Sequence, residues 1–543
     1  MCSFELRPLP PPATRWSLST LALGILHRGW RRLSVGALPP GTVRRLAGMA
    51  LAALWARMLA ACLAAIVAAP AIAQTPFRFA VEQFADLSPG PQSSGPRSLM
   101  AHGGMLYFNA KSGAGYGLFR TDGTSIHRIA DNDAFARLAA GNTLYFTDSS
   151  RLFVERGDSL AELGAGEFNL STAAFPSEFV EFQDQLYFTA DNKLFRSDGV
   201  SVEPVSGAMD LQSARFLTPF GNRLAFSAIG PQGREAYITN GTTVELLSDI
   251  NPSVGDSAPG EFTALGDDLY FSANGPGGFE LYRYDGIAVD RVADINSGSG
   301  HSSPNHLTPL GGSLIFAATG PQGRELYKTD GVTTNLLADI WPGPGDSDPM
   351  DVFNHQFADF GNELVFVARG PDGYGPYRTD GDTVSPLPLS NGEPMRGLSS
   401  SFTVAGDRLL FLSERRLHQY NGESVGPLSN LHVRQIALIR GELVLNAEGP
   451  DGIELYTIHG DDVVQLANVY PGEGHLGDGV FGPFSSNPGN FVEFNGDLYF
   501  TARGPAGEEL YRLTVVPEPM SPVLAALAGA AAIASRARSR EAG

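Results

Sequence analysis

The sequence predicts an all-β fold, a β-propeller of four-stranded blades. Short runs of Leu, Tyr, Phe, Val and Thr with alternating polarity follow one another along most of the 543 residues, separated by Gly, Pro, Asn and Asp, without a helical period. The stretch LIFAATGPQGRELYKTDGVTTNLLADIWPG, which begins at Leu314, recurs in modified form from Leu224 and from Leu269. A repeat of about 40 to 50 residues that contains four strands is typical of a propeller blade.

Each repeat unit contains four apolar runs, which in one unit lie at 262–266, 269–273, 280–284 and 288–295. The second and third runs are separated by Gly-Pro-x-Gly, in which Pro suits the second position of a turn and Gly the fourth. The third and fourth runs are separated by Asp-Gly or Asn-Gly, for which we expect a two-residue hairpin with positive φ angles. An apolar pair in the second run marks ten units, from Tyr107-Phe108 to Tyr499-Phe500.

The two ends of the repeat region predict how the fold closes. The last unit, 491–513, lacks a fourth run, whereas residues 79–89 resemble a fourth run and the loop after it. We therefore expect the amino-terminal strand to complete the last blade and to leave no open sheet edge. One ring of about ten blades is the simplest arrangement, and two smaller propellers are the alternative because known rings commonly have four to eight blades.

Residues 1–73 are predicted to be a targeting segment. Arginines precede an apolar run at 58–69 that is too short to span a bilayer comfortably. Ala71 and Ala73 form a small-x-small site, which predicts cleavage before Gln74.

Two alternatives concern the same segment. The part that precedes Met49 is longer than the charged region of a leader needs, so translation from Met49 is one alternative. Cleavage at Cys62, which follows Leu-Ala-Ala as in a lipoprotein signal, is a less favoured one.

The composition of the mature chain excludes several classes of chemistry. Cys2 and Cys62 both lie in the segment that is expected to be removed, so disulfides, cysteine nucleophiles and zinc thiolates are not expected. Removal of eight arginines and one glutamate with residues 1–73 changes the formal net charge from -20 to -27. An acidic protein is a poor partner for nucleic acid or an anionic membrane surface, and suits divalent cations or basic partners.

The carboxyl terminus, 516–543, combines a short motif, an apolar run at 522–534 and an arginine tail. This order resembles the PEP-CTERM sorting signal. The resemblance implies an exported protein of a Gram-negative bacterium, transient insertion of the apolar run into the inner membrane, processing by an exosortase, and a cell-surface or extracellular location. An ordinary carboxyl-terminal anchor or tail is the alternative. The residues concerned are Val516, Pro517, Glu518, Pro519, Arg536, Arg538 and Arg540.

The repeat units of the domain at 74–515 resemble the bacterial repeats named for ELW-x-x-DGT. The nearest match is Glu-Leu-Tyr-Lys-Thr-Asp-Gly-Val at 325–332, where Tyr stands in the place of the family's Trp. The resemblance implies a surface or secreted β-repeat protein and carries no catalytic residue to this chain.

A glutamate recurs at the start of the third run in five units. Because a residue repeated in many blades usually serves the structure of each blade, we expect these carboxylates to accept backbone N–H bonds from the adjacent Gly-Pro turn. A ring of carboxylates that binds a ligand is the alternative. The residues are Glu235, Glu280, Glu325, Glu454 and Glu509.

Aspartates in the Gly-rich loops after the fourth run are weak calcium candidates. Turn formation is the favoured interpretation because their spacing matches no dedicated calcium loop, although loop carboxylates suit calcium. The residues are Asp249, Asp256, Asp294, Asp339 and Asp346.

No motif of nucleophilic catalysis, metal ligation or phosphate binding is found, so we expect a protein that binds and does not catalyse. The expected ligand is extracellular polysaccharide or another matrix component. A glycan-active propeller enzyme and a calcium-stabilised adhesin are the alternatives. Loops after the fourth run are the expected recognition surface, with the candidate residues His301, Trp341, Tyr470 and His475.

Overall fold

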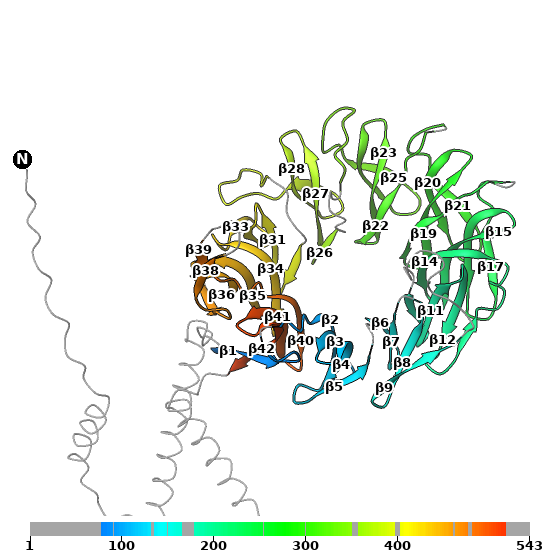
Figure 1. Cartoon of the computed structure of the whole chain (residues 1–543). Coiled ribbons are helices and arrows are strands. Elements are labelled where there is room, and N and C mark those ends of the chain that lie inside the picture. Colours follow the sequence, from blue (N-terminus) through cyan, green and yellow to red (C-terminus); the bar gives the residue numbers. More distant parts are fainter. Residues whose placement is uncertain are drawn as a thin grey trace, which may run out of the picture. The chain divides into compact units, whose positions relative to one another are not determined.

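The computed structural model describes residues 78–516 apart from 91, 132–134, 149, 166–178, 253–254, 299, 350–356, 397–401, 460–461 and 476–480. In this part of the chain, ten four-stranded antiparallel sheets and one two-stranded hairpin form. The sheets are arranged as a ring around a common axis (Figure 1). The all-β propeller and the ten blades are confirmed, and the chain forms one ring instead of two.

We number the blades in chain order. Blade 1 is β2 (Arg97–His102), β3 (Met105–Ser112), β4 (Gly115–Thr121) and β5 (Ile126–Ala130). Blade 2 is β6 (Phe135–Ala140), β7 (Thr143–Thr147), β8 (Leu152–Arg156) and β9 (Ser159–Leu163). Blade 3 is β10 (Phe179–Phe182), β11 (Gln185–Ala190), β12 (Lys193–Ser197) and β13 (Val202–Pro204).

The next three blades are the most regular. Blade 4 is β14 (Gln212–Phe220), β15 (Arg223–Gly230), β16 (Gly233–Thr239) and β17 (Val244–Ser248). Blade 5 is β18 (Gly260–Leu265), β19 (Asp268–Gly275), β20 (Gly278–Tyr284) and β21 (Val289–Ala293). Blade 6 is β22 (Asn305–Leu310), β23 (Ser313–Gly320), β24 (Gly323–Thr329) and β25 (Thr334–Ala338).

Three further blades lead to the closing blade. Blade 7 is β26 (Ala358–Phe360), β27 (Glu363–Gly370), β28 (Gly373–Thr379) and β29 (Val384–Pro386). Blade 8 is β30 (Thr403–Ala405), β31 (Arg408–Ser413), β32 (Arg416–Tyr420) and β33 (Val425–Pro427). Blade 9 is β34 (His432–Ile439), β35 (Glu442–Gly449), β36 (Gly452–His459) and β37 (Asp462–Ala467), and is followed by the hairpin β38 (Glu473–His475) and β39 (Phe481–Pro483).

Blade 10 joins the two ends of the described chain. It consists of β40 (Gly489–Phe494), β41 (Asp497–Gly504), β42 (Gly507–Val516) and β1 (Arg78–Ala85), in the order β1-β42-β41-β40. Phe79 pairs with Val515, and Ala85 pairs with Leu510. Figure 1 shows β1, in blue, beside β42, in red. The predicted closure by the amino-terminal strand is therefore confirmed.

The apolar pair in the second strand of each blade packs against both neighbouring blades. Successive residues of a strand point to opposite faces of the sheet. In blade 5, Tyr270 packs against Leu314 and Phe316 of blade 6, whereas Phe271 packs with Ala225 of blade 4. The core is thus a series of layers between blades, and the first strand of each blade lies innermost, toward the axis of the ring (Figure 1).

The Gly-Pro-x-Gly turns form as two-residue loops, with Gly230 paired to Gly233 in blade 4. The fourth residue must be glycine because the φ angle of Gly233 is 104°. The first residue of the turn must also be glycine, for a steric reason that the sequence does not show. A Cβ atom added to Gly230 would lie 2.1 Å from the Tyr237 hydroxyl oxygen.

The prediction of two-residue hairpins at the Asp-Gly and Asn-Gly turns was wrong for the regular blades. In blade 6, Thr329 pairs with Thr334, which leaves a four-residue loop. The Asp330 carboxylate accepts N–H bonds from Val332 (2.9 Å) and Thr333 (2.7 Å), and Gly331 takes the positive φ of 87°. The aspartate therefore acts as a side-chain cap, an Asx turn, and needs no positive φ of its own.

Candidate functional site

The five repeated glutamates are fully buried and each one is bound to a serine in the loop that enters the next blade. In blade 6, the Glu325 carboxylate accepts bonds from the Ser347 hydroxyl (2.6 Å), the Ser347 N–H (3.1 Å) and the Ile340 N–H (2.8 Å). We call this arrangement the Glu–Ser latch. The prediction that the glutamates serve the structure is confirmed, but their partner is this loop and not the adjacent Gly-Pro turn.

The serine of each latch connects two blades. The backbone carbonyl of Ser347 accepts a bond from the N–H of Arg369 in blade 7 (2.7 Å), while the Ser347 side chain holds Glu325 of blade 6. The same pattern recurs at four other junctions. The pairs are Glu235–Ser257, Glu280–Ser302, Glu325–Ser347, Glu454–Ser486 and Glu509–Ser94.

Burial raises the pKa of all five glutamates, and the hydrogen bonds from the serine hydroxyls oppose this rise. Each carboxylate nevertheless accepts hydrogen bonds from the loop that enters the next blade, as Glu325 does from Ile340 and Ser347. These groups are enclosed and occupied, so they hold neighbouring blades together and do not form a ring of carboxylates that is open to a ligand.

Blade 7 keeps the Gly-Pro turn but lacks the glutamate. Gly375 stands at the position of Glu325, and a Cβ atom added there would lie 2.6 Å from the Met395 carbonyl oxygen. The loop after β29 therefore passes where the latch side chain begins in other blades. Leu387 donates its N–H to the Pro376 carbonyl (2.9 Å), and Met395 donates its N–H to the Leu387 carbonyl (2.8 Å).

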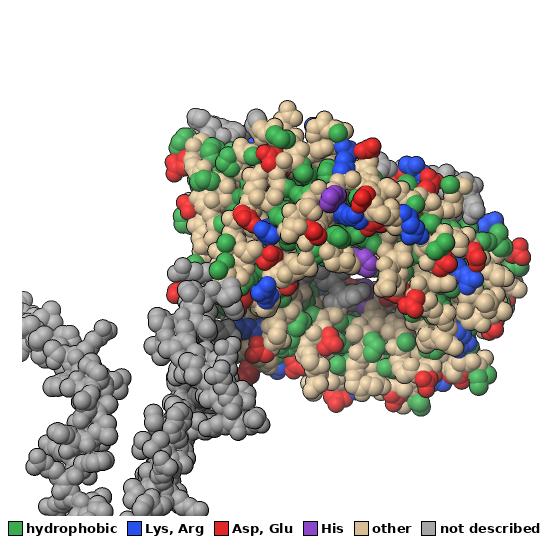
Figure 2. Space-filling model, turned by 90° about the horizontal axis from the view of Figure 1, so that it is seen from below, with side chains coloured by type: hydrophobic (Ala, Val, Ile, Leu, Met, Phe, Trp, Pro, Cys, Tyr) green, Lys and Arg blue, Asp and Glu red, His purple; other side chains and the backbone are tan. Residues whose placement is uncertain are grey.

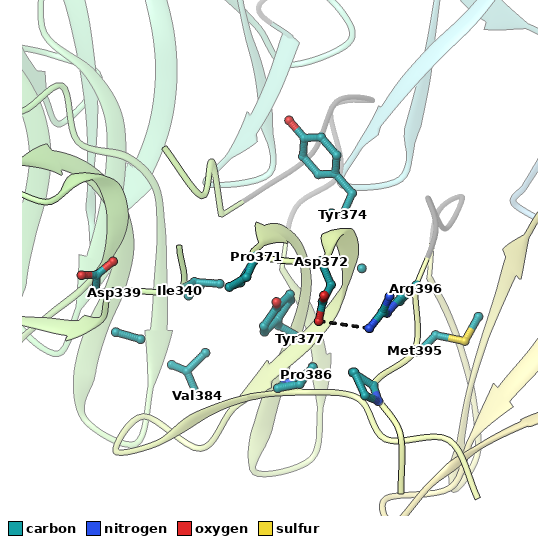
Figure 3. Close-up of a pocket in the computed structure, with 14 residues that line it drawn as sticks. Asp339, Ile340, Pro371, Asp372, Tyr374, Tyr377, Val384, Pro386, Met395 and Arg396 are labelled. Carbon is teal, nitrogen blue, oxygen red and sulfur yellow. Dashed lines mark ion pairs between the residues drawn. The ribbon is translucent and has the colours of Figure 1, made fainter. Parts of the chain in front are cut away.

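A pocket of about 320 Å³ lies between this turn, the loop after β29 and the end of β25 (Figure 3). Its lining combines apolar residues with the Asp372–Arg396 ion pair, whose N–O distance is 3.1 Å. Tyr374 and Tyr377 add two phenol rings, and Figure 3 shows the Tyr374 ring extending from the turn at one side of the pocket. Asp339 also lines the pocket, and its Oδ1 atom is buried without a hydrogen-bond partner. Apolar surface with a few polar groups is typical of a small-ligand site.

Trp341, one of the four predicted recognition residues, follows the pocket residue Ile340 in the chain. The Arg369 guanidinium lies 3.9 Å from the centre of its ring and 5.9 Å from the centre of the Tyr374 ring. Such a cation–π contact is attractive even though Arg369 is exposed. One face of Trp341 is therefore already covered, and Tyr374 is the aromatic residue that the pocket itself presents.

His301 has a structural role that the sequence analysis did not predict. Its Nδ1 atom accepts the N–H bond of Phe279 (2.9 Å), and its ring lies 5.7 Å from the Phe279 ring. Asp256 and Asp346 occupy the same position, directly before a latch serine, and accept the N–H bonds of Arg234 (2.7 Å) and Arg324 (2.8 Å). These three side chains cap the Gly-Pro hairpin of the preceding blade.

Tyr470 and His475 lie in the segment between blades 9 and 10, and Trp341 lies at the junction of blades 6 and 7. The Tyr470 ring stacks on Phe484 with a centroid distance of 4.6 Å. His475 ends β38, where its backbone pairs with Phe481. The structure thus places the four predicted recognition residues in three separate junction loops and does not bring them together.

The calcium candidates are likewise spread over three junction loops. Asp294 lies 3.5 Å from Arg291, and Asp249 has a buried Oδ1 atom without a partner, as Asp339 does. Across the described ranges, no group of three or more His, Cys, Asp or Glu side chains is arranged to hold a metal ion. Calcium binding therefore has no assembled site among these residues.

The innermost strands carry a feature that the sequence analysis missed. In blades 1, 4, 5, 6 and 10 the first strand contains a bulge with a non-glycine residue at a positive φ angle, and blade 4 has a second such residue, Ser213. Such positions are uncommon and are often found at functional sites. The aligned residues differ in chemistry and are Ser98, Phe216, Glu261, His306 and Asn490. An alignment of the repeats would have shown that this position varies, but not that its backbone is unusual.

The surface is mixed in charge. Figure 2 shows acidic and basic side chains dispersed over one face, with a hollow beside which histidine side chains lie. Within the described ranges, no helix has the length and apolar character needed to cross a membrane.

No protein-family model matches the chain, and no curated protein matches it. Among solved structures, it is similar to the tricorn protease at 16% identity, over 76% of this chain and 42% of that chain, with a TM-score of 0.22. It is similar to an extracellular domain from B. thetaiotaomicron at 11% identity, over 79% and 73% of the two chains, with a TM-score of 0.27. A third similarity is to PorZ, a surface component of the type-IX secretion system of Porphyromonas gingivalis, at 10% identity, over 78% and 57%, with a TM-score of 0.26. The match spans less than half of the tricorn chain.

Proposed function

We propose that the chain is an exported, non-catalytic propeller protein that binds extracellular polysaccharide or another matrix component. The observation that carries this proposal is the pocket at blade 7, where the latch is missing and Tyr374, Tyr377 and an exposed ion pair line the opening. Aromatic rings and hydrogen-bonding side chains are the groups that bind sugar rings, and loops on a rigid scaffold are where recognition usually resides.

The carboxyl-terminal segment completes the proposal. Residues 516–543 act as a PEP-CTERM sorting signal, and an exosortase cuts the chain near Pro517-Glu518-Pro519 after the leader has been removed before Gln74. Only Val516 of this signal lies within the described residues, at the end of β42. Mass spectrometry of the exported protein should find termini near Gln74 and the Pro-Glu-Pro motif, and recovery of an intact Arg540 tail outside the cell would contradict sorting.

Binding is tested by co-sedimentation of the purified chain with extracellular polysaccharide. Tyr374→Ala should weaken binding because it removes the ring that the pocket presents. Tyr116→Ala is the matched control, since Tyr116 occupies the same position of the blade 1 turn, between two glycines, and is 48% exposed. Equal binding by the two variants would show that the pocket of blade 7 is not the binding site.

Catalysis is tested with a panel of glycosidase and esterase substrates. The proposal predicts no turnover above that of a heat-denatured control. Turnover that is abolished by one acid-to-amide substitution, for example Glu261→Gln on the inner strand of blade 5, would favour the glycan-active enzyme.

A further inference from the structure

Blade 4 carries two arginines, Arg215 on the inner strand β14 and Arg234 at the start of β16, that share the face of Ser227 on the strand between them. The Arg234 guanidinium donates to the Ser213 carbonyl (2.9 Å) and contacts the Ser227 hydroxyl (3.4 Å). Arg215, on β14, is the cross-strand partner of Ser227. Paired residues of neighbouring strands project to the same face of a sheet, so the Arg215 side chain lies on the face where Ser227 meets Arg234.

Blade 6 provides the comparison that makes this pair unusual. Its Arg324 occupies the position of Arg234 and donates to the equivalent carbonyl, that of Ser303 (3.2 Å). Asn305 stands at the position of Arg215, and its side-chain oxygen accepts a bond from Arg324. The Asp348 carboxylate lies 4.0 Å from the same guanidinium.

Blade 4 replaces both of these acceptors. Arg215 stands in place of Asn305. Ala258, which directly follows Ser257, stands in place of Asp348, which directly follows Ser347. The Asp256 carboxylate accepts the backbone N–H of Arg234 at 2.7 Å. Burial and the neighbouring Arg215 both lower the pKa of Arg234, as expected for a guanidinium beside a like charge.

The bulge of β14 also exposes an aromatic side chain. Phe216 follows Arg215 in the chain, takes the positive φ of 58° at the bulge, and is 50% exposed. One edge of its ring lies next to Gly260 of blade 5, 3.4 Å from where a Cβ atom would be. Exposed aromatic and guanidinium groups together suit a ligand that has both a ring and an anionic group.

We propose that Arg215 of β14 and Arg234 of β16 form an oxyanion-binding site on one face of blade 4, and that its ligand is the carboxylate of an acidic sugar residue packed against Phe216. The identity of this ligand rests on the proposed function. Two guanidinium groups can bind a carboxylate through charge-assisted hydrogen bonds. The ligand would supply the acceptor oxygen that Asn305 supplies in blade 6 and the negative charge that Asp348 supplies there. An acidic protein would in this way bind an acidic glycan through a local positive site.

The test is calorimetry on the full chain with three probes: trigalacturonate, neutral galactotriose and sodium sulfate. Arg215→Asn recreates the arrangement of blade 6 and should lower the affinity for trigalacturonate about tenfold. Arg434→Asn removes the same charge from an exposed position on the inner strand of blade 9 and should leave the affinity within about twofold. Galactotriose should bind equally to both variants.

The outcomes separate this inference from the proposed function. Trigalacturonate that binds equally to Arg215→Asn and Arg434→Asn would overturn the arginine site and leave glycan binding standing. Binding of sulfate alone, lost in Arg215→Asn, would overturn the acidic sugar as the ligand and would also count against the proposed function. Binding of none of the three probes would overturn the site itself.

Discussion

Blades 6 and 7 are neighbours that share the same Gly-Pro-x-Gly turn and differ at the second residue after it. In blade 6, Glu325 binds Ser347 and Ile340 and joins the blade to the next one. In blade 7, Gly375 takes that place, the following loop packs differently, and a pocket lies beside the turn. The comparison teaches that the repeat joins neighbouring blades through the Glu–Ser latch, and that a departure from the repeat leaves a pocket at the junction.

The largest effect is expected when the ring is opened. Deletion of residues 78–89 removes β1 and exposes the edge of β42, so we expect a loss of more than about 5 kcal/mol in the free energy of unfolding. A chain that begins at residue 78 is the control. Equal melting temperatures of the two proteins would contradict closure by the amino-terminal strand.

A smaller effect is expected when one latch is removed. Glu280→Ala removes the acceptor of the Ile295 N–H and one of the two acceptors of the Ser302 hydroxyl and N–H, which both also reach the Phe279 carbonyl, so we expect a cost of about 1 to 3 kcal/mol in chemical denaturation. Glu423→Ala, at an exposed turn, should change stability by less than about 0.5 kcal/mol. Similar costs for the two variants would contradict the claim that the Glu–Ser latch stabilises the fold.

The sequence predicts the fold well because the fold depends on local patterns. The alternation of apolar and polar residues in the strands and the Gly-Pro turns were enough to predict ten blades. The resemblance of residues 79–89 to a fourth strand was enough to predict how the ring closes. The Glu–Ser latch is harder to predict from the sequence, because Ser302 follows Glu280 by 22 residues whereas Ser486 follows Glu454 by 32. The hairpin β38–β39 accounts for the longer spacing, so no constant interval marks the pair.

The contacts of the candidate residues were harder to predict from the sequence than the fold. His301 was a recognition candidate because it is a polar residue in a loop, but it accepts a backbone N–H bond as Asp256 does at the same position. The pocket of blade 7 depends on Gly375 and on a loop path that only the structure shows. The exchange of Asn305 for Arg215 between aligned repeats was visible in the sequence, but its meaning depends on the contacts of Arg324 and Arg234.

A third prediction, with an expected effect of similar size, concerns the close approach of the Tyr327 hydroxyl to Gly320. A methyl group at Gly320 would lie 2.0 Å from the Tyr327 hydroxyl oxygen, so Gly320→Ala should cost about 1 to 3 kcal/mol. Tyr327→Phe removes the hydroxyl and should reduce that cost in the double variant. Gly426→Ala, where no atom lies within 4 Å of the added Cβ, is the control. An unchanged cost in the Tyr327→Phe background would contradict the steric explanation.

The smallest effects concern pH and have opposite signs for the two kinds of carboxylate. The raised pKa of Glu280 means that its contribution to stability is present at low pH and is lost as pH rises through that pKa. The pKa of Asp330 is lowered by its bonds to the backbone N–H groups of Thr333 and Val332, so its contribution is present at neutral pH and is lost as pH falls through that pKa. Glu280→Gln should therefore cost less at neutral pH than in mild acid, and Asp330→Asn should cost more at neutral pH than in strong acid.

These costs are measured by denaturant unfolding of each variant and the parent over a pH series. The same sign of the pH dependence for both variants would contradict the assignment of one carboxylate to a buried latch and the other to an exposed cap.

Hydrogen exchange measured by mass spectrometry tests most directly whether the latches make some junctions more rigid than others. The account predicts slow exchange at the amides of Ser257, Ser302 and Ser347, which donate to buried glutamates, and faster exchange in residues 387–396, where blade 7 has no latch. In Glu325→Gln, protection should fall at Ser347 and remain at Ser257. Uniform protection at latched and unlatched junctions, or a loss that is not confined to Ser347 and its neighbours, would contradict the claim that each Glu–Ser latch joins one pair of blades.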